Sequence, residues 1–355
     1  ITISQIGNAQ FGVIVTSNIG NTSTTGITFS GTTYLFGNAA GQSDTVTITA
    51  TGTGEVIDFT GGATTFASAG ENAATAGNAI TFATGTIDLA NGSNLTITSD
   101  GGAISVAGIR GDSSETVTIT ANVTDGGNAS TTETVNITGD IGNANEILSV
   151  AITAQDGITL TGVTIDTADD TDPNIAFTGP VTVSGTVVVT ADNTNNDGTV
   201  NFSSTIDGAG GTDNLSIQSG TGALTLTGII GAGTSLDTLN INTDAGTAAI
   251  TIAGLGDTDA AGAITTNIGN STTSNMTFGG TYFRSSGDLT VTTAAGAGTI
   301  DFTGAAPVVT TGGNAVSFVG GSILLADGAD LTINTNISNA ASNGGNISIA
   351  GAIAG

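Results

Sequence analysis

The feature that most constrains the fold of this chain is a series of short segments in which apolar residues alternate with small polar ones. Thr45–Thr49, Thr116–Thr120 and Asn346–Ile349 are examples, and each has the period-two pattern of a half-buried β-strand. Clusters of the turn residues Gly, Asn, Asp and Ser separate these segments, as in Asn91–Ser93. No segment shows a helical period, so the sequence predicts an all-β protein.

A longer repeat lies on top of the short strands. Residues 17–111 return in the same order at residues 266–355, and residues 112–265 lie between the two copies. The matched segments are Asn18–Asn21 with Asn267–Asn270, Ile27–Phe29 with Met276–Phe278, Ile57–Gly61 with Ile300–Gly304, Gly77–Phe82 with Gly313–Phe318, Asn94–Ile97 with Asp330–Ile333, and Gly102–Gly108 with Gly345–Gly351. The differences in spacing fall between strands, where loops tolerate insertions. We therefore expect residues 1–355 to form one continuous array of stacked coils.

Two all-β architectures fit such a pattern. A parallel β-solenoid stacks coils of about 20 to 25 residues, whereas tandem β-sandwiches are built from antiparallel sheets around large core residues. The chain has no Trp and only 2 Tyr, but it has short strands and small residues at the turns. These features favour the solenoid. We expect about 15 coils, stacked at the usual distance between neighbouring strands. The expected large core residues are Phe29, Phe59, Phe82, Phe177, Phe202, Phe278, Phe302 and Phe318.

The charge balance excludes several function classes. The formal net charge is −27, with no Lys, no His and two basic residues, Arg110 and Arg284. Proteins that bind nucleic acid neutralise phosphates with Lys and Arg, so we expect no nucleic-acid partner. The absence of Cys excludes disulfides and thiolate metal sites. No stretch of about 18 apolar residues is present, so we expect no membrane-spanning helix.

Candidate sites are few. A lyase base of the Arg or Lys type has only the two arginines to draw on, and a glycoside hydrolase needs facing carboxylates. The densest acidic cluster consists of Asp166, Asp169, Asp170 and Asp172, and we favour a solvated turn there because Asp is a common turn residue. Carboxylates also bind Ca²⁺, so these four residues are the candidate calcium ligands and Ca²⁺ the only candidate cofactor. We expect no catalytic residue.

A resemblance to known proteins is carried by the middle of the chain. The segments concerned are Gly198–Phe202, Ser204–Gly208, Asn214–Ile217, Gly220–Gly228 and Leu239–Ile241. They resemble the β-strand repeats of giant filamentous-haemagglutinin-like exoproteins and autotransporter adhesins, which are similar in composition across nearly the whole chain. The resemblance implies a right-handed parallel β-helix with roles in adhesion, aggregation and surface fibres. The matching motifs are compositional, so no functional residue is carried over.

These observations predict a structural or adhesive segment of an extracellular or cell-surface filament, without enzymatic activity, that assembles by stacking of β-coils. Its expected partners are copies of itself or adjoining repeats end to end, together with surface glycans or other cells. The alternative is a polysaccharide-active or carbohydrate-binding parallel β-helix, which requires clustered carboxylates and an aromatic platform in a groove.

Overall fold

The structure is a computed structural model, and it describes residues 1–7, 16–21, 23–36, 45–51, 56–68, 79–121, 133–143, 145–168, 174–191, 198–244, 246–258, 261–336 and 344–355. The described residues form a parallel β-solenoid of about 11 turns and contain no helix. Their contacts divide the chain into two compact units. Unit 1 comprises Ile1–Asp170 and Ala176–Pro180, and unit 2 comprises Thr171–Ile175 and Val181–Gly355.

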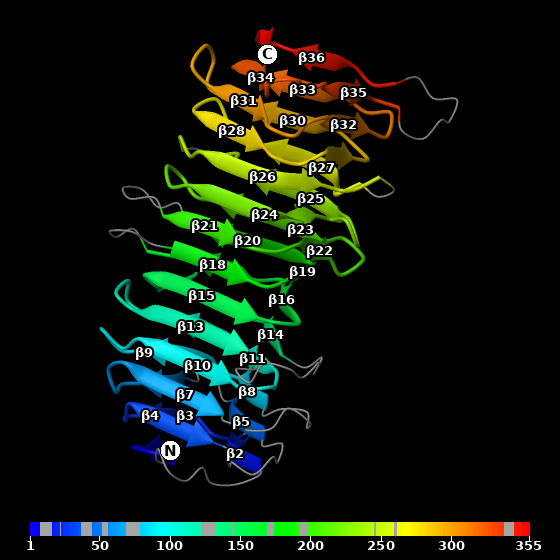
Figure 1. The fold of residues 1–355 in the computed structure, drawn as a ribbon. Helices are drawn as coiled ribbons and strands as arrows, with labels where there is room; N and C mark the ends of the chain where they lie inside the picture. The colour runs from blue at the N-terminus through cyan, green and yellow to red at the C-terminus, as the bar shows by residue number, and fades with distance from the viewer. Residues whose placement is uncertain are drawn as a thin grey trace. The chain divides into compact units, whose positions relative to one another are not determined.

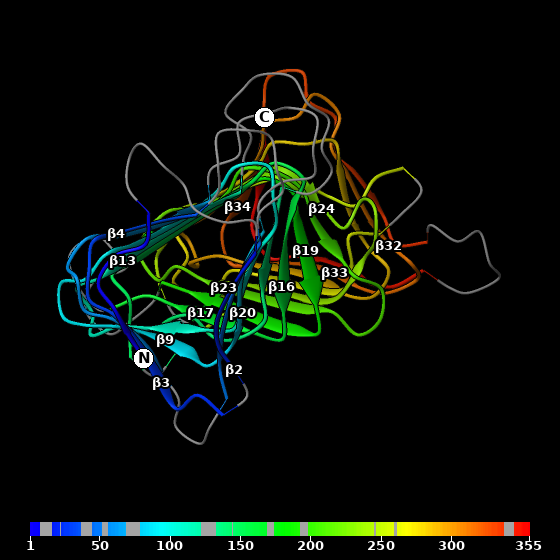
Figure 2. The same ribbon diagram turned by 90° about the horizontal axis from the view of Figure 1, so that it is seen from below.

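Unit 1 is built from three parallel ladders, one on each side of its coils. One ladder is the sheet β1-β3-β6-β9-β12, the second pairs β4, β7, β10, β13 and β15, and the third pairs β2, β5, β8, β11, β14 and β16. Figure 2 shows β3 and β9, β4 and β13, and β2 and β16 on different sides of the coils. The strands are β1 (Thr2–Ile3), β2 (Thr16–Asn21), β3 (Gly26–Phe29), β4 (Thr33–Phe36), β5 (Thr45–Ala50), β6 (Val56–Phe59), β7 (Thr64–Ser68), β8 (Ala79–Thr84), β9 (Thr86–Leu89), β10 (Leu95–Ser99), β11 (Ile104–Val106), β12 (Ile109–Arg110), β13 (Thr116–Ala121), β14 (Thr134–Ile137), β15 (Ser149–Ala154), β16 (Gly157–Thr161) and β17 (Thr164–Asp166).

Unit 2 repeats this plan. One ladder joins β19, β22, β24, β26, β29, β32 and β35 (Figure 1). The second joins β20, β23, β25, β27, β30, β33 and β36. The third joins β21, β24, β26, β28, β31, β34 and β37, so β24 and β26 each take part in two ladders. Its strands are β19 (Val181–Ser184), β20 (Thr186–Thr190), β21 (Thr199–Phe202), β22 (Ile206–Gly208), β23 (Asn214–Gln218), β24 (Leu224–Ile230), β25 (Leu236–Ile241), β26 (Ile250–Leu255), β27 (Ala263–Ile268), β28 (Asn275–Phe278), β29 (Tyr282–Ser285), β30 (Leu289–Thr292), β31 (Thr299–Phe302), β32 (Val308–Thr311), β33 (Val316–Val319), β34 (Ser322–Leu325), β35 (Thr332–Asn334), β36 (Ile347–Ile349) and β37 (Ile353–Ala354), while β18 (Asn174–Thr178) is divided between the units.

The alternation in the sequence explains why these segments become strands. In β13 and β15 every second residue is buried, so the apolar side chains face the interior and the Thr and Ser hydroxyls face outward. The pairing is in register, with Val117 opposite Val150 and Ile119 opposite Ile152. The ladders are parallel, so the solenoid prediction is confirmed and tandem antiparallel sandwiches are wrong. All eight Phe residues expected in the core are buried.

The predicted number of coils was too high. About 11 turns are present rather than about 15, because many coils are longer than the strand pattern suggested. Hydrogen-bonded partners on neighbouring coils are 22 residues apart at Asp88 and Arg110, but 33 residues apart at Ser113 and Glu146. The insertions lie between strands, where they leave the ladder pairing intact.

The two copies of the long repeat place matching residues at matching positions in their own units. Phe29 stacks on Phe59 with ring centroids 4.9 Å apart, and Phe278 stacks on Phe302 at 5.1 Å. Ile3 pairs with Phe29 just as Ile252 pairs with Phe278. The match therefore extends upstream to Ile1–Gly7 and Ile250–Gly256, a pair that sequence inspection did not include.

Close backbone contacts at one corner explain a glycine that both copies share. A Cβ atom on Gly61 would lie 2.0 Å from the carbonyl oxygen of Gly31, and one on Gly304 would lie 2.5 Å from that of Gly280. Only glycine allows the next coil to approach this closely. The Phe-Thr-Gly sequence at the end of each matched strand is thus a packing signal.

Candidate functional site

Of the four residues in the acidic cluster Asp166, Asp169, Asp170 and Asp172, the structure describes Asp166. It ends β17 and is half-buried, and its pKa is raised to about 6. Burial is the main cause, the negative charge of Glu146 adds to it, and a hydrogen bond from the backbone N–H of Thr167 opposes it. Asp169, Asp170 and Asp172 lie outside the described residues. The four-residue calcium site therefore stays a prediction.

In the part of the chain that the structure describes, the side chains around Asp166 do not form a set of metal ligands. Among the described residues, no group of three or more acidic side chains lies close enough together to hold a metal ion. Glu146 raises the pKa of Asp166 and accepts a hydrogen bond from the hydroxyl of Ser113 at 3.1 Å. This arrangement makes Asp166 a proton-binding group in the acidic range.

Asp166→Asn is expected to stabilise the protein at pH 7 and to change little at pH 4. The folded pKa of about 6 exceeds the unfolded value of about 3.9. The folded state therefore binds the proton more tightly, and stability falls as the pH rises between these two values. Because Asp166 is partly exposed, solvent screening reduces the expected gain at pH 7 to roughly 1 kcal/mol. Urea unfolding at both pH values checks this, with the exposed Asp330→Asn as control, and an equal gain at both pH values would contradict it.

Other acidic side chains fix the corners between coils. Both carboxylate oxygens of Glu115 accept hydrogen bonds, from the backbone N–H groups of Gly92 and Asp112, each at 2.7 Å. Asp213 accepts from the N–H groups of Gly185 and Gly210 at 2.9 and 2.8 Å. Both side chains are buried, at 0% and 3% exposure. The sequence alone did not indicate this role for Glu115 or Asp213.

These corner carboxylates share a position in the sequence, directly before a strand. Glu115 comes directly before β13, Asp213 before β23 and Asp288 before β30. Asp288 follows the same rule, because its Oδ1 accepts a hydrogen bond from the N–H of Ala315 on the next coil at 2.8 Å. At these three positions, an acidic residue at the entry to a strand forms a bond between coils, since its carboxylate lies beside N–H groups of a turn.

The two arginines are both engaged with neighbouring coils. Arg110 forms an ion pair with Asp88 at 2.9 Å on the outer surface of unit 1. Arg284 is 8% exposed, and its guanidinium donates to the carbonyl oxygen of Asp257.

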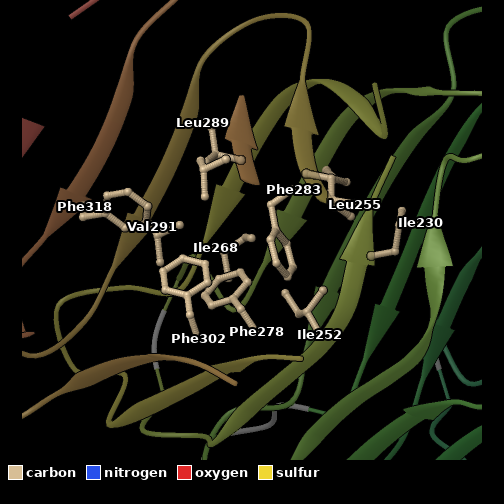
Figure 3. A pocket seen from close by; sticks show the side chains of 12 residues that line it. Ile230, Ile252, Leu255, Ile268, Phe278, Phe283, Leu289, Val291, Phe302 and Phe318 are labelled. Carbon is tan, nitrogen blue, oxygen red and sulfur yellow. The ribbon is translucent and has the colours of Figure 1, made fainter. Parts of the chain in front are cut away.

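The interior of unit 2 contains a small apolar cavity (Figure 3). Its walls include Phe278, Phe283, Phe302 and Val309, and they leave about 10 Å³ for the centre of a water molecule. That space is at the lower limit for a single water, and the lining side chains offer no hydrogen-bond partner, so the cavity is expected to be dry. It is therefore a packing defect rather than a ligand site.

Comparison with known proteins finds no family model, no curated protein and no solved structure that matches this chain. The resemblance to haemagglutinin-like exoproteins and autotransporter adhesins thus stays a prediction. Across the described residues, the structure has no helix of the length and apolarity needed to cross a membrane.

Proposed function

We propose that this chain is a structural and adhesive segment of an extracellular or cell-surface filament, and that it assembles by stacking of β-coils. One observation carries the proposal. Val316 and Ile323 are 0% exposed, whereas their ladder partners on the next coil, Ile347 and Ile353, are 49% and 52% exposed. Apolar residues at the same coil positions thus become buried when a further coil covers them.

The proposed occupant of this surface is a further coil, supplied by a second copy of the chain or by adjoining repeats. Among the described residues, strands β35 to β37 each pair with the preceding coil and with no strand on the other side, and such an edge is a template for further pairing. Contact between unlike ends does not close on itself, so it produces a filament rather than a ring. Burial of apolar surface at each junction supplies the driving force.

Adhesion and an extracellular location are the further parts of the proposal. Outward Thr and Ser hydroxyls line strands such as β13 and β15, and the chain carries a net charge of −27. Polar, strongly charged faces keep filaments apart laterally and leave the hydroxyls free for neighbouring surfaces. The resemblance to surface exoproteins favours surface glycans or other cells as the partners.

The test is substitution at the exposed coil. Ile347→Asp with Ile353→Asp is expected to abolish filaments in sedimentation assays while leaving the circular dichroism of the monomer unchanged, because both side chains are already half-exposed. Ile264→Asp is the matched control, since Ile264 is 46% exposed on β27, away from that coil. Filaments that persist in the double variant, or that are lost equally in the control, contradict stacking at this surface.

A further inference from the structure

The outer surface of unit 1 has a groove of about 240 Å³ beside the Arg110–Asp88 ion pair. Polar side chains in its lining come from Thr86, Arg110, Asp140 and Asn143. The remaining lining is formed by Ala107, Gly108 and the backbone of Ile109, a core residue that is 1% exposed. The groove thus combines polar side chains with a wall of Ala107 and backbone. Its volume is below the range of about 300–1,000 Å³ for sites that enclose drug-sized ligands.

Hydrogen bonds within the protein hold these polar groups in place. Asp140 accepts from the backbone N–H of Thr164 through Oδ1 and from the side-chain amide of Asn143 through Oδ2, both at 2.7 Å. Arg110 is held by the carboxylate of Asp88 at 2.9 Å. Each Asp140 oxygen keeps a second lone pair, and the Asn143 amide carries its own acceptor oxygen, so the groove presents oriented donors and acceptors.

The second copy of the repeat shows that the ladder forms without the ion pair. Ile87 and Asp88 pair with Ile109 and Arg110, whereas Ile323 and Leu324 pair with Ile353 and Ala354. Leu324 and Ala354 therefore stand in the places of Asp88 and Arg110. An ion pair this exposed contributes little to stability. Its presence in one copy alone points to a role other than folding.

The charges in the groove select an uncharged ligand. The guanidinium of Arg110 is already paired with Asp88, so it offers no free positive charge to an anion. The net charge of −27 also repels anions at long range. Among the described residues, Asp140 is the single lining carboxylate, and the guanidinium beside it disfavours a metal ion. The remaining class is a neutral ligand with several hydroxyl groups and an apolar face.

We propose that this groove binds one ring of a neutral saccharide, with the hydroxyl groups on Asp140, Asn143, Arg110 and Thr86, and the C–H face against Ala107 and Gly108. The inference deepens the adhesive part of the proposed function, on which it rests, by naming the class of ligand. Filament stacking is tested separately at Ile347 and Ile353, so either part can fail alone.

The experiment is saturation-transfer-difference NMR of the full chain with glucose, galactose and N-acetylglucosamine, each titrated separately, and with glucuronate and Ca²⁺ as further arms. At least one neutral sugar is expected to bind saturably with a millimolar Kd. Asp88→Leu with Arg110→Ala, which copies the second repeat, and Asp140→Ala are each expected to weaken binding at least tenfold. Asp58→Asn, one coil earlier in the same ladder and outside the groove, is expected to leave the Kd unchanged.

Every outcome bears on the proposal. Absence of saturable binding by all three neutral sugars overturns it, as does saturable binding by glucuronate or Ca²⁺ alone. An unchanged Kd in both groove variants also overturns it, because the sugar then binds elsewhere. Circular dichroism of the variant with Asp88→Leu and Arg110→Ala is expected to match that of the unsubstituted chain, since the second repeat folds with Leu324 and Ala354 in those places.

Discussion

Replacing Phe66 with alanine is expected to lower the free energy of unfolding by about 3–5 kcal/mol, the range for large-to-small changes at buried Phe. Phe66 is 0% exposed, and its ring lies 4.8 Å from Phe36, 5.3 Å from Phe82 and 5.6 Å from Phe29, measured between centroids. Alanine removes these three ring contacts at once. The rigid backbone ladders allow little collapse into the space that is left, so most of the cavity cost remains.

The second repeat supplies the control for this prediction. Val309 pairs with Phe283 and Ile333 as Phe66 pairs with Tyr34 and Ile97, so the two residues are equivalent. The small dry cavity of unit 2 lies beside Val309, where the copy lacks a ring. Phe66→Val is therefore expected to cost less than Phe66→Ala in guanidinium unfolding. Equal costs for the two variants, or a cost below about 1 kcal/mol for alanine, would contradict the packing account.

Glu115→Ala is expected to destabilise unit 1 by about 3 kcal/mol or more, because several donors lose a charged acceptor in a buried place. These donors are the N–H groups of Gly92 and Asp112 and the hydroxyl of Ser114, each 2.7 Å from a carboxylate oxygen. Alanine offers none of them a replacement. Hydrogen exchange at Gly92 and Asp112 is expected to accelerate more than exchange in unit 2, which places the loss at this corner.

The effect of Glu115 depends on pH with a definite sign. Burial pushes its pKa upward, but the hydrogen bonds from Asp112, Ser114 and Gly92 outweigh burial and leave the pKa below its usual value. Its stabilisation is therefore complete above the unfolded pKa of about 4.3 and is lost as the pH falls through the lower folded value. The difference between Glu115→Ala and the unsubstituted chain should narrow in acid. A difference that stays constant from pH 7 to the acid range would show that the carboxylate charge plays no part.

Much of the architecture follows from the sequence, because the period-two pattern and the ordered repeat are compatible with few folds. The alternation in Thr116–Ala121 predicts one buried face, and the small residues between strands predict the turns of a solenoid. The close approach of the coils at the Phe-Thr-Gly ending is known only from the structure. The lengths of the coils did not follow, because insertions between strands leave no periodic signal. The right hand of the coil, the single continuous array and the calcium site at Asp166–Asp172 stay predictions.

The groove and the corner carboxylates could not be predicted from sequence alone. Asp88 and Arg110 are 22 residues apart, and Asp140 is further along the chain, so their proximity depends on coil length. Glu115 and Asp213 looked like ordinary turn residues because Asp and Glu are common in solvated loops. Their burial depends on the N–H groups of a neighbouring coil, which only the stacking brings close.

Electron cryo-microscopy of the purified chain, at a resolution that separates β-strands, tests stacking assembly most directly. We predict continuous filaments with strands perpendicular to the axis and an axial spacing of about 4.8 Å that runs unbroken across the junctions between chains. Two results would contradict stacking assembly. One is isolated single-chain particles at concentrations well above those of the sedimentation assays on the Ile347→Asp, Ile353→Asp variant. The other is filaments whose strand spacing breaks at every junction.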